Sequence, residues 1–241
     1  MIATSLGLNR LRLRMAHIAQ TYLVTGANRG IGLELVRALR ARGDTVYATT
    51  RSGNDANLAT LGAKVIALDL SDSASITALS AKLEEIALDC VINNAGVSSD
   101  AKTLEQVTLA ELTRVFTVNA FAPILVAQAA KAALARGSRK VVCNISSQLA
   151  SITNNTGGST YAYRGSKTAL NQMNMSLANE LRGEGFCCIS VHPGWVRTDM
   201  GGEKAPMLPP QSAAHIVTLI DGVKAEDSGK FFNFDGAKMP W

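Results

Sequence analysis

The chain has 241 residues, 47% of them hydrophobic and 18% charged, which suits one large α/β domain with a sizeable core and excludes wholesale disorder. Its net charge of +5 includes Arg10, Arg12 and Arg14 of an N-terminal segment without acidic residues, so the remainder carries 21 basic against 19 acidic residues. No nucleic-acid-binding surface is expected from so small an excess of positive charge.

Residues 1–19 form a leader that precedes the domain expected over residues 20–241. An arginine-rich, acid-poor N-terminus is typical of an organelle targeting peptide. Its arginines alternate with leucines, however, which would scatter them around a helix instead of gathering them on one face. The other interpretation is a translation start at Met15 and a cytoplasmic protein; organelle targeting by residues 1–19 stays open.

From residue 20 onward, short apolar runs alternate with amphipathic segments of helical period. This alternation predicts an α/β fold, namely a single-domain Rossmann-type doubly wound parallel sheet of about seven strands with helices on both faces. Helices are expected over 32–41, 74–86 and 115–134, around Tyr163 and near Gln211. The strands are expected at 21–25, 45–50, 64–68, 90–94, 139–145, 186–191 and 229–234.

Membrane segments, disulfides and metal sites are not expected. The most apolar long stretch, residues 118–130, is interrupted by Asn119, Pro123 and Gln128 and is shorter than the ~18 residues of a spanning helix. The three histidines are far apart and show no ligand spacing for a metal. Four cysteines inside apolar runs, without a CxxC pair, indicate reduced core thiols: Cys90, Cys143, Cys187 and Cys188.

A glycine-rich turn, TGANRGIG at residues 25–32, joins the first expected strand directly to the first helix. Glycines let backbone N–H groups approach a pyrophosphate closely, and the helix N-terminus adds positive partial charge. The position of the turn inside a βαβ unit therefore predicts a dinucleotide site. The predicted contacts are Gly26, Asn28, Arg29, Gly30, Ile31 and Gly32.

The end of the second strand indicates which dinucleotide binds. An acidic residue usually follows this strand and accepts from the ribose hydroxyls, but here the chain reads Thr49, Thr50, Arg51. Arg51 and Arg29 offer forked donors that suit a 2′-phosphate, so NADP(H) is favoured over NAD(H). The alternative is that both arginines merely solvate loops.

Four motifs in order carry a family resemblance: TGxxxGxG at 25–32, NNAG at 93–96, YRGSK at 163–167 and HPG at 192–194. Together, over roughly residues 20–241, they resemble the short-chain dehydrogenase/reductase family. Within it, YAYRGSKTALN at 161–171 and HPGWVRTDMGG at 192–202 are similar to the Sniffer-like and C-factor-like carbonyl reductase group.

The resemblance implies further cofactor contacts, all at the carboxyl ends of expected strands, where such sheets bind ligands. Asp69 and Leu70 would contact the adenine, although Asp69 could instead be the N-cap of a helix that begins near Ser71. The segment Asn93, Asn94, Ala95 and Gly96 would line the cofactor while steadying the central sheet. The remaining implied contacts are Pro193, Gly194, Val196 and Thr198.

Tyr163 and Lys167 are four residues apart on an expected helix, so their side chains share one face. A nearby ammonium is expected to lower the tyrosine pKa from ~10 by ~1–3 units, which suits proton transfer. Tyr161 is excluded as the acid because Gly165, not a lysine, follows it by four residues. Both Tyr163 and Lys167 are also expected to contact the cofactor.

Two further residues complete the expected catalytic set. A hydroxyl donor must stabilise the charge that develops on a reduced carbonyl oxygen, and Ser146 and Ser147 follow the fifth strand. The resemblance favours Ser147, but the sixteen-residue spacing to Tyr163 is long and leaves Ser146 open. Asn119 could be a plain polar residue on a helix flank; the resemblance implies that it opens the helix and holds a water that relays protons to Lys167.

These residues predict an NADP-dependent enzyme that transfers a hydride between NADPH and a small-molecule carbonyl or alcohol, that is, a carbonyl reductase. The alternative is an NAD(P)-binding signalling or regulatory protein with incidental catalysis. The short segment 198–210 predicts an open site for small or flat apolar aldehydes, ketones or quinones, walled by Trp195, Met200 and Met207. By family analogy, a homodimer would form through the helices of Asn119 and Tyr163.

Overall fold

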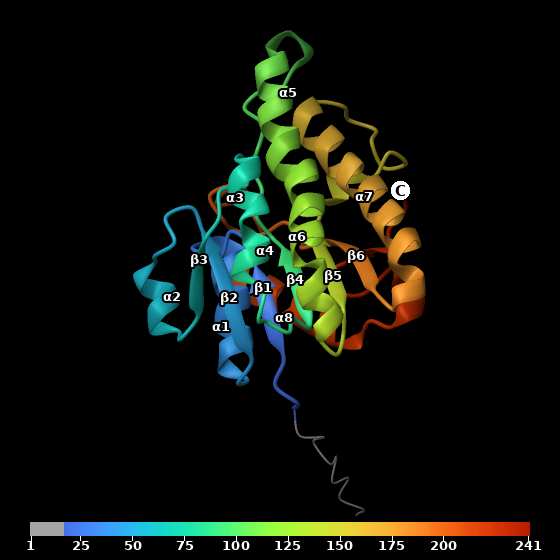
Figure 1. Cartoon of the computed structure of the whole chain (residues 1–241). Coiled ribbons are helices and arrows are strands. Elements are labelled where there is room, and N and C mark those ends of the chain that lie inside the picture. Colours follow the sequence, from blue (N-terminus) through green and yellow to red (C-terminus); the bar gives the residue numbers. More distant parts are fainter. Residues whose placement is uncertain (1–16) are drawn as a thin grey trace, which may run out of the picture.

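The computed structural model describes residues 17–241, so most of the expected leader lies outside the described part. Within this part, seven parallel strands form one sheet in the order β3-β2-β1-β4-β5-β6-β7 (Figure 1). The doubly wound sheet and all seven expected strands are confirmed, with ends that differ by at most two residues. The strands are β1 Thr21–Val24, β2 Thr45–Thr50, β3 Lys64–Ala67, β4 Cys90–Asn93, β5 Val141–Ile145, β6 Cys187–His192 and β7 Phe231–Asn233.

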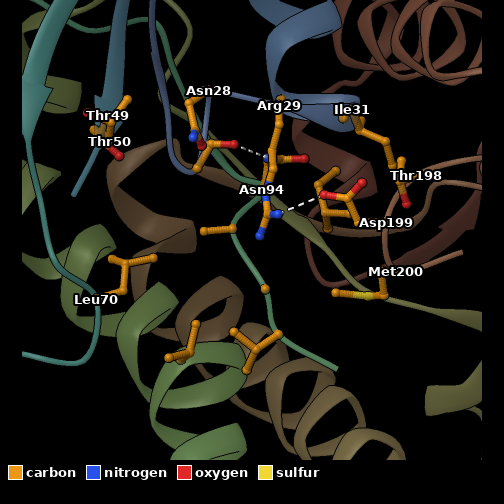
Figure 2. Close-up of a pocket in the computed structure, with 18 of the residues that line it drawn as sticks. Asn28, Arg29, Ile31, Thr49, Thr50, Leu70, Asn94, Thr198, Asp199 and Met200 are labelled. Atoms are coloured by element: carbon orange, nitrogen blue, oxygen red, sulfur yellow. Dashed lines mark hydrogen bonds and ion pairs between the residues drawn. The ribbon is translucent and has the colours of Figure 1, made fainter. Parts of the chain in front are cut away.

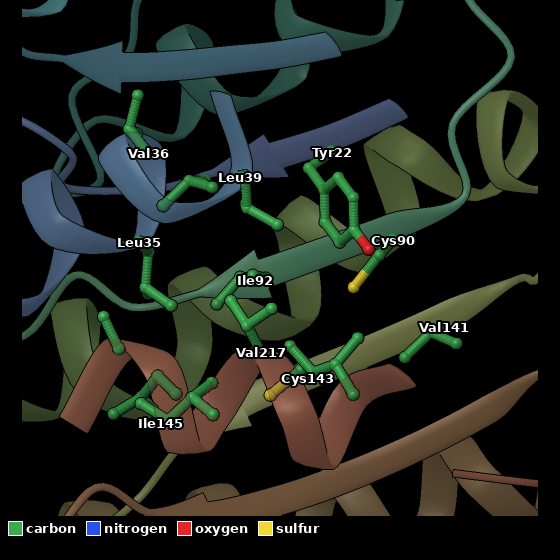
Figure 3. Packing of buried hydrophobic residues seen from close by; sticks show 14 of the residues in the cluster. Tyr22, Leu35, Val36, Leu39, Cys90, Ile92, Val141, Cys143, Ile145 and Val217 are labelled. Carbon is green, nitrogen blue, oxygen red and sulfur yellow. The ribbon is translucent and has the colours of Figure 1, made fainter. Parts of the chain in front are cut away.

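Helices cover both faces because successive strand residues point to opposite sides. Tyr22, Cys90 and Cys143 lie on the face covered by α1 Gly30–Ala41 and α8 Pro209–Gly222 (Figure 3). Leu23, Val91 and Val142 lie on the other face. That face is covered by α3 Ser73–Thr77, α4 Leu79–Lys82, α6 Ala122–Arg136 and α7 Tyr161–Leu181, while α2 Ala56–Thr60 packs beside β3. Apolar side chains are thus buried on both sides of the sheet.

The single helix expected over residues 74–86 is wrong, because two short helices, α3 and α4, stand in its place. The Thr77 hydroxyl donates to Ser73 O, and the Ser80 hydroxyl donates to Thr77 O. Such local side-chain bonds compete with a continuous helix. The apolar face survives the break, since Ile76, Leu79 and Leu83 remain buried.

A helical run of 28 residues, Leu109–Arg136, consists of α5 Leu109–Phe116, a π-helical turn Thr117–Phe121 and α6. It is longer than the segment 118–130 considered above, and with a mean hydropathy of 1.4 it is long and apolar enough to cross a membrane. Half of its most apolar window is nevertheless buried inside the protein, where α6 packs on β4, β5 and α7. Length and composition alone therefore do not distinguish a spanning helix from a helix that covers this sheet.

Candidate functional site

A cavity of about 890 Å³ opens at the carboxyl ends of the parallel strands. The segments that follow β1 to β6 all contribute side chains to its wall (Figure 2). Its volume lies within the range of cofactor sites, and its position is where open parallel sheets bind ligands. The fold thus creates one site from segments that are far apart in the chain.

The glycine-rich turn needs its glycines for close packing. A Cβ on Gly26, whose φ is +61°, would lie 2.8 Å from Ala95 Cβ, and a Cβ on Gly32 would lie 2.3 Å from Gly26 O. Asn94 Nδ2 donates to Thr25 O at 3.0 Å and to Gly26 O at 3.1 Å, which holds the turn in place. Among residues 17–241 no side chain caps the N-terminus of α1, and its first residues, Gly30, Ile31 and Gly32, line the cavity, so their N–H groups are available to a ligand.

Most of the residues expected to bind the cofactor are on the cavity wall. Asn93, Gly194 and Val196 are not among the lining residues. Those that line it are Gly26, Asn28, Arg29, Gly30, Ile31, Gly32, Arg51, Asp69, Leu70, Ala95, Gly96, Tyr163, Lys167, Pro193 and Thr198.

Asn93 steadies the sheet instead of facing the cavity. Its Nδ2 donates to Asn144 Oδ1 at 2.8 Å and to Pro123 O at 3.1 Å. Asn144 in turn donates to Asn174 Oδ1 at 2.9 Å. This buried chain of amides ties β4, β5, α6 and α7 together, which agrees with one half of the expected role of Asn93.

At the adenosine end, Asp69 accepts from Ser71 N at 2.9 Å and from Ser71 Oγ at 2.6 Å. These bonds lower the pKa of Asp69, and the charge of Arg51 lowers it further, so the two residues are neighbours. The cap of α3 is Asp72, whose carboxylate accepts from Ala74 N. The alternative role of Asp69 as that helix cap is therefore wrong.

Tyr163 and Lys167 both line the cavity from the first turns of α7. Burial lowers the pKa of Lys167 to about 8, and its Nζ donates to Ile145 O at 2.7 Å. Burial raises the pKa of Tyr163, and only a hydrogen bond with Ser147 opposes the rise. Contrary to the expectation, the lysine ammonium does not lower the pKa of Tyr163 in this structure. The phenol accordingly stays protonated at neutral pH and can act as an acid.

The two candidate serines differ in their surroundings. Ser147 Oγ is the partner that lowers the pKa of Tyr163, and it also accepts from Leu149 N at 3.1 Å as the cap of a short 3₁₀ helix. Ser146 Oγ is buried at the cavity wall with no partner among the described residues. Ser147 is thus the serine that acts on the pKa of the phenol, whereas Ser146 is the one that lines the cavity.

Asn119 lies in the π-helical turn between α5 and α6, so the helix does open locally at this residue. Its Oδ1 accepts from Val97 N at 2.8 Å, and its Nδ2 donates to Val97 O at 2.9 Å and to Ser166 Oγ at 3.1 Å. A Cβ on Gly96 would lie 3.3 Å from Asn119 Oδ1 and 3.5 Å from Lys167 Nζ. Gly96 therefore keeps space between the amide and the ammonium, behind the cavity wall.

The family model for short chain dehydrogenases matches residues 20–209. The chain belongs to the short-chain dehydrogenase family. C-signal of Myxococcus xanthus is 43% identical over 154 residues, covering 64% of this chain and 93% of that protein. Carbonyl reductase Sniffer of D. melanogaster superposes with a TM-score of 0.88 at 33% identity, covering 93% and 100% of the two chains. An NADPH-bound carbonyl reductase from chicken fatty liver has a TM-score of 0.85 at 33% identity, covering 92% and 99%.

Sequence reasoning missed several residues of this short-chain dehydrogenase that line the cavity. Thr49 and Thr50 end β2, and Asp199 follows Thr198. A rule that takes every residue within three positions of a strand's carboxyl end would have included the two threonines. Other residues missed on the wall are Ser52, Asn54, Asp55, Leu68, Ser71, Val97, Val118, Ile145, Arg197 and Pro209. Asn94, Ser146 and Met200, which the sequence did single out, also line the cavity.

No group of three or more His, Cys, Asp or Glu side chains within residues 17–241 of this dehydrogenase could hold a metal ion. The four cysteines are free and buried, and burial raises the pKa of each thiol. They are therefore inert side chains of the core.

Proposed function

We propose that this protein is an NADPH-dependent carbonyl reductase, an oxidoreductase that transfers a hydride between NADPH and a carbonyl or alcohol substrate. One observation carries the proposal: a protonated Tyr163, with Ser147 beside it and Lys167 one turn away, lines a cavity shaped for a dinucleotide. Similarity to the NADPH-bound chicken reductase and to Sniffer supports it.

The residues present fit NADP(H). A Cβ on Gly26 or Gly32 would collide with Ala95 or with backbone, so only glycines allow this compact turn, which lies on the cavity wall where a pyrophosphate would bind. The free N–H groups at the start of α1 suit its negative charge. Arg51 stands where an acidic residue would repel a 2′-phosphate, and Arg29 supplies a second guanidinium.

In the proposed mechanism the bound cofactor supplies the hydride, and the protein positions and polarises the substrate. Tyr163 donates its proton to the carbonyl oxygen, which suits a phenol whose pKa is raised by burial. Ser147 donates a hydrogen bond to the same oxygen as negative charge develops. Lys167 would hold the cofactor ribose. Asn119 would hold a water that relays protons to Lys167.

We propose small or flat apolar carbonyl compounds as substrates. The flap between β6 and α8 is short, and the half-exposed Met200 lines the cavity. Trp195, which was also expected in the wall, is half exposed but is not among the lining residues. Met207 is a correction to the expected walls: it packs under Gly194, with Sδ 2.9 Å from where a Cβ would lie, and does not line the cavity. Trp195 Nε1 is bound to Gly201 O, which orients the exposed ring.

The test combines an activity screen with one substitution. NADPH oxidation is measured with a panel of aldehydes, ketones and quinones, for wild type, Tyr163→Phe and the control Tyr161→Phe, whose ring is exposed outside the cavity. We expect Tyr163→Phe to lose turnover by about 10²–10⁴-fold with NADPH binding unchanged, because only the acid is removed. Full activity in Tyr163→Phe would refute the proposed acid.

A second candidate function is a cofactor-binding signalling protein with incidental catalysis. The 43% identity to C-signal is the observation that favours it. The same screen separates the two functions: tight NADPH binding without turnover of any carbonyl compound would favour signalling. The catalytic set of Asn119, Ser147, Tyr163 and Lys167 favours the enzyme, since binding alone does not need a proton donor.

We also propose a homodimer that forms through α6 and α7. Phe121 and Leu125 support it, because they are large apolar side chains exposed on the helical run that covers the sheet. Sedimentation of wild type and Leu125→Glu tests it: a monomeric wild type contradicts the proposal.

A cytoplasmic location is proposed as well, with organelle targeting by residues 1–19 as the alternative. The four free thiols suit a reducing compartment. Imaging of the full chain and of residues 15–241, each fused to a fluorescent protein, distinguishes the two. Deletion of residues 1–14 should leave activity unchanged under either interpretation of the leader.

A further inference from the structure

An ion pair crosses the mouth of the cofactor cavity. Arg29, in the glycine-rich turn before α1, donates through Nη1 to Asp199 Oδ2 at 2.7 Å, although 170 positions separate the two residues in the chain. Asp199 lies in the flap after β6, and both residues line the cavity (Figure 2). The pair therefore links the glycine-rich turn to the flap across the opening of the cavity.

The flap backbone holds Asp199 in this place. Trp195 Nε1 donates to Gly201 O at 2.8 Å, and Gly202 N donates to Thr198 O at 2.8 Å, so the flap is a closed turn. The Thr198 methyl lies 3.2 Å from where a Cβ of Gly30 would be, which means that the flap already packs against the glycine-rich turn. The Asp199 carboxylate is consequently presented to Arg29 by packed backbone on both sides.

The arginine is turned away from the place where the proposed function requires it. Figure 2 shows Arg29 directed to Asp199, with Thr49 and Thr50 at the end of β2 on the other side of the view. Arg51, the other basic residue of the phosphate subsite, follows Thr50 directly. In this conformation a carboxylate takes the guanidinium that a 2′-phosphate would need.

Resting on the proposed binding of NADPH, we propose that Asp199 is an internal competitor for the cofactor 2′-phosphate and so determines how tightly and how selectively NADPH binds. The phosphate must draw Arg29 away from Asp199, and the carboxylate also repels the incoming negative charge. Both effects weaken NADPH binding and speed its release, whereas NADH, which lacks the 2′-phosphate, is affected less. Asp199 thus lowers the selectivity for NADPH over NADH.

The expected change in NADPH affinity follows from how exposed the two side chains are. The side chains of Arg29 and Asp199 are 73% and 80% exposed, so water and salt screen the pair. Exposed pairs of this kind change an equilibrium by about two- to fivefold. High salt should remove most of the difference, because the screening length falls to ~3 Å at 1 M.

The experiment measures dissociation constants of NADPH and NADH for the full chain by cofactor fluorescence, at low salt and at 1 M salt. Asp199→Asn removes the competing charge and keeps the side-chain shape. Glu203→Gln is the matched control, because Glu203 is an exposed carboxylate of the same flap with no ion-pair partner among the described residues. We expect Asp199→Asn to tighten NADPH about two- to fivefold and NADH less, only at low salt, with Glu203→Gln unchanged.

Three results would overturn the proposal: unchanged or weaker NADPH binding in Asp199→Asn, equal tightening of both cofactors, or the same tightening in Glu203→Gln. A cycle with Arg29→Ala sharpens it, since Asp199→Asn should have a smaller effect once the arginine is gone and only the repulsion between carboxylate and phosphate remains. Failure of the proposed function is a separate result. A protein that binds NADPH as described but reduces no carbonyl compound keeps this inference and loses the reductase.

Discussion

Buried polar groups have hydrogen-bond partners at one end of the parallel strands and lack them at the other. We call the end where the strands begin the amino edge and the end where they finish the carboxyl edge. At the amino edge, the fully buried Asp44 accepts from His17 Nε2 at 2.7 Å, from Gln20 N at 2.9 Å and from Arg42 Nε at 2.5 Å. At the carboxyl edge, Ser146 Oγ and His192 Nδ1 are buried without a partner among the described residues. Fully paired groups stabilise a fold, whereas unpaired ones beside a cavity are available to a ligand.

Asp89 repeats the amino-edge pattern. Its carboxylate accepts from Thr21 N at 2.9 Å, Ser138 N at 2.8 Å and Ser138 Oγ at 2.6 Å. Burial pushes the pKa of Asp89 upward, but these bonds outweigh burial and the pKa is lowered. Lys167 at the carboxyl edge shows the opposite balance, because burial dominates and lowers its pKa. The comparison predicts that substitutions at the amino edge lower stability and that substitutions at the carboxyl edge lower activity.

The largest stability effect is expected at the amino edge. Asp44→Ala leaves Arg42 and His17 without their buried acceptor, and it should lower the free energy of unfolding by about 3–5 kcal/mol. Urea denaturation measures the loss. Activity per folded molecule should be unchanged, because Asp44 does not line the cavity. A stable Asp44→Ala protein would show that the network does not hold this edge together.

The next largest effect is a gain in stability, and it is expected from a substitution at the carboxyl edge. The folded pKa of Lys167, about 8, is below its ordinary 10.5, so between these values the unfolded state binds the extra proton. Stability therefore rises with pH across this window, and below pH 8 the buried charge costs about 3 kcal/mol. Lys167→Met should gain that stability at pH 7, lose it as the pH approaches 10.5, and abolish turnover.

Thermal and urea unfolding of Lys167→Met at several pH values measure this effect. Lys131→Met is the control, because Lys131 is an exposed residue of α6 that pairs with Glu184. Its stability should be close to that of wild type at every pH. A Lys167→Met protein less stable than wild type at pH 7 would contradict the cost assigned to the buried ammonium.

The smallest effect on stability tests how burial changes the strength of the two ion pairs that Arg42 forms. Arg42 also pairs with Asp221 at 2.6 Å, but the Asp221 side chain is 42% exposed whereas that of Asp44 is fully buried. Asp221→Asn should therefore cost less than about 1 kcal/mol in the same urea experiment. Equal losses for Asp221→Asn and Asp44→Ala would mean that charge, not burial, decides the strength of these pairs.

Local patterns predicted the parts of the site that depend on local physics. Apolar runs placed the strands, because burial on both faces requires continuous apolar residues. The break at Ala78 escaped prediction, since serine and threonine bonds compete weakly with helix and only their sum ends it. The position of Met207 also escaped, because it depends on packing under Gly194. The roles assigned to Ser147 and Asn119 stay predictions, and neither residue is among those that line the cavity.

The sequence by itself determined the succession of strands and helices along the chain, the glycine-rich turn and the spacing of Tyr163 and Lys167. These features depend on residues that are close together in the chain and therefore in space. Only the tertiary structure decided that Lys167 donates to Ile145 O and that burial raises the pKa of Tyr163. It also decided that Arg29 meets Asp199. Such partners are chosen by long-range packing, and burial then determines how strongly their charges act.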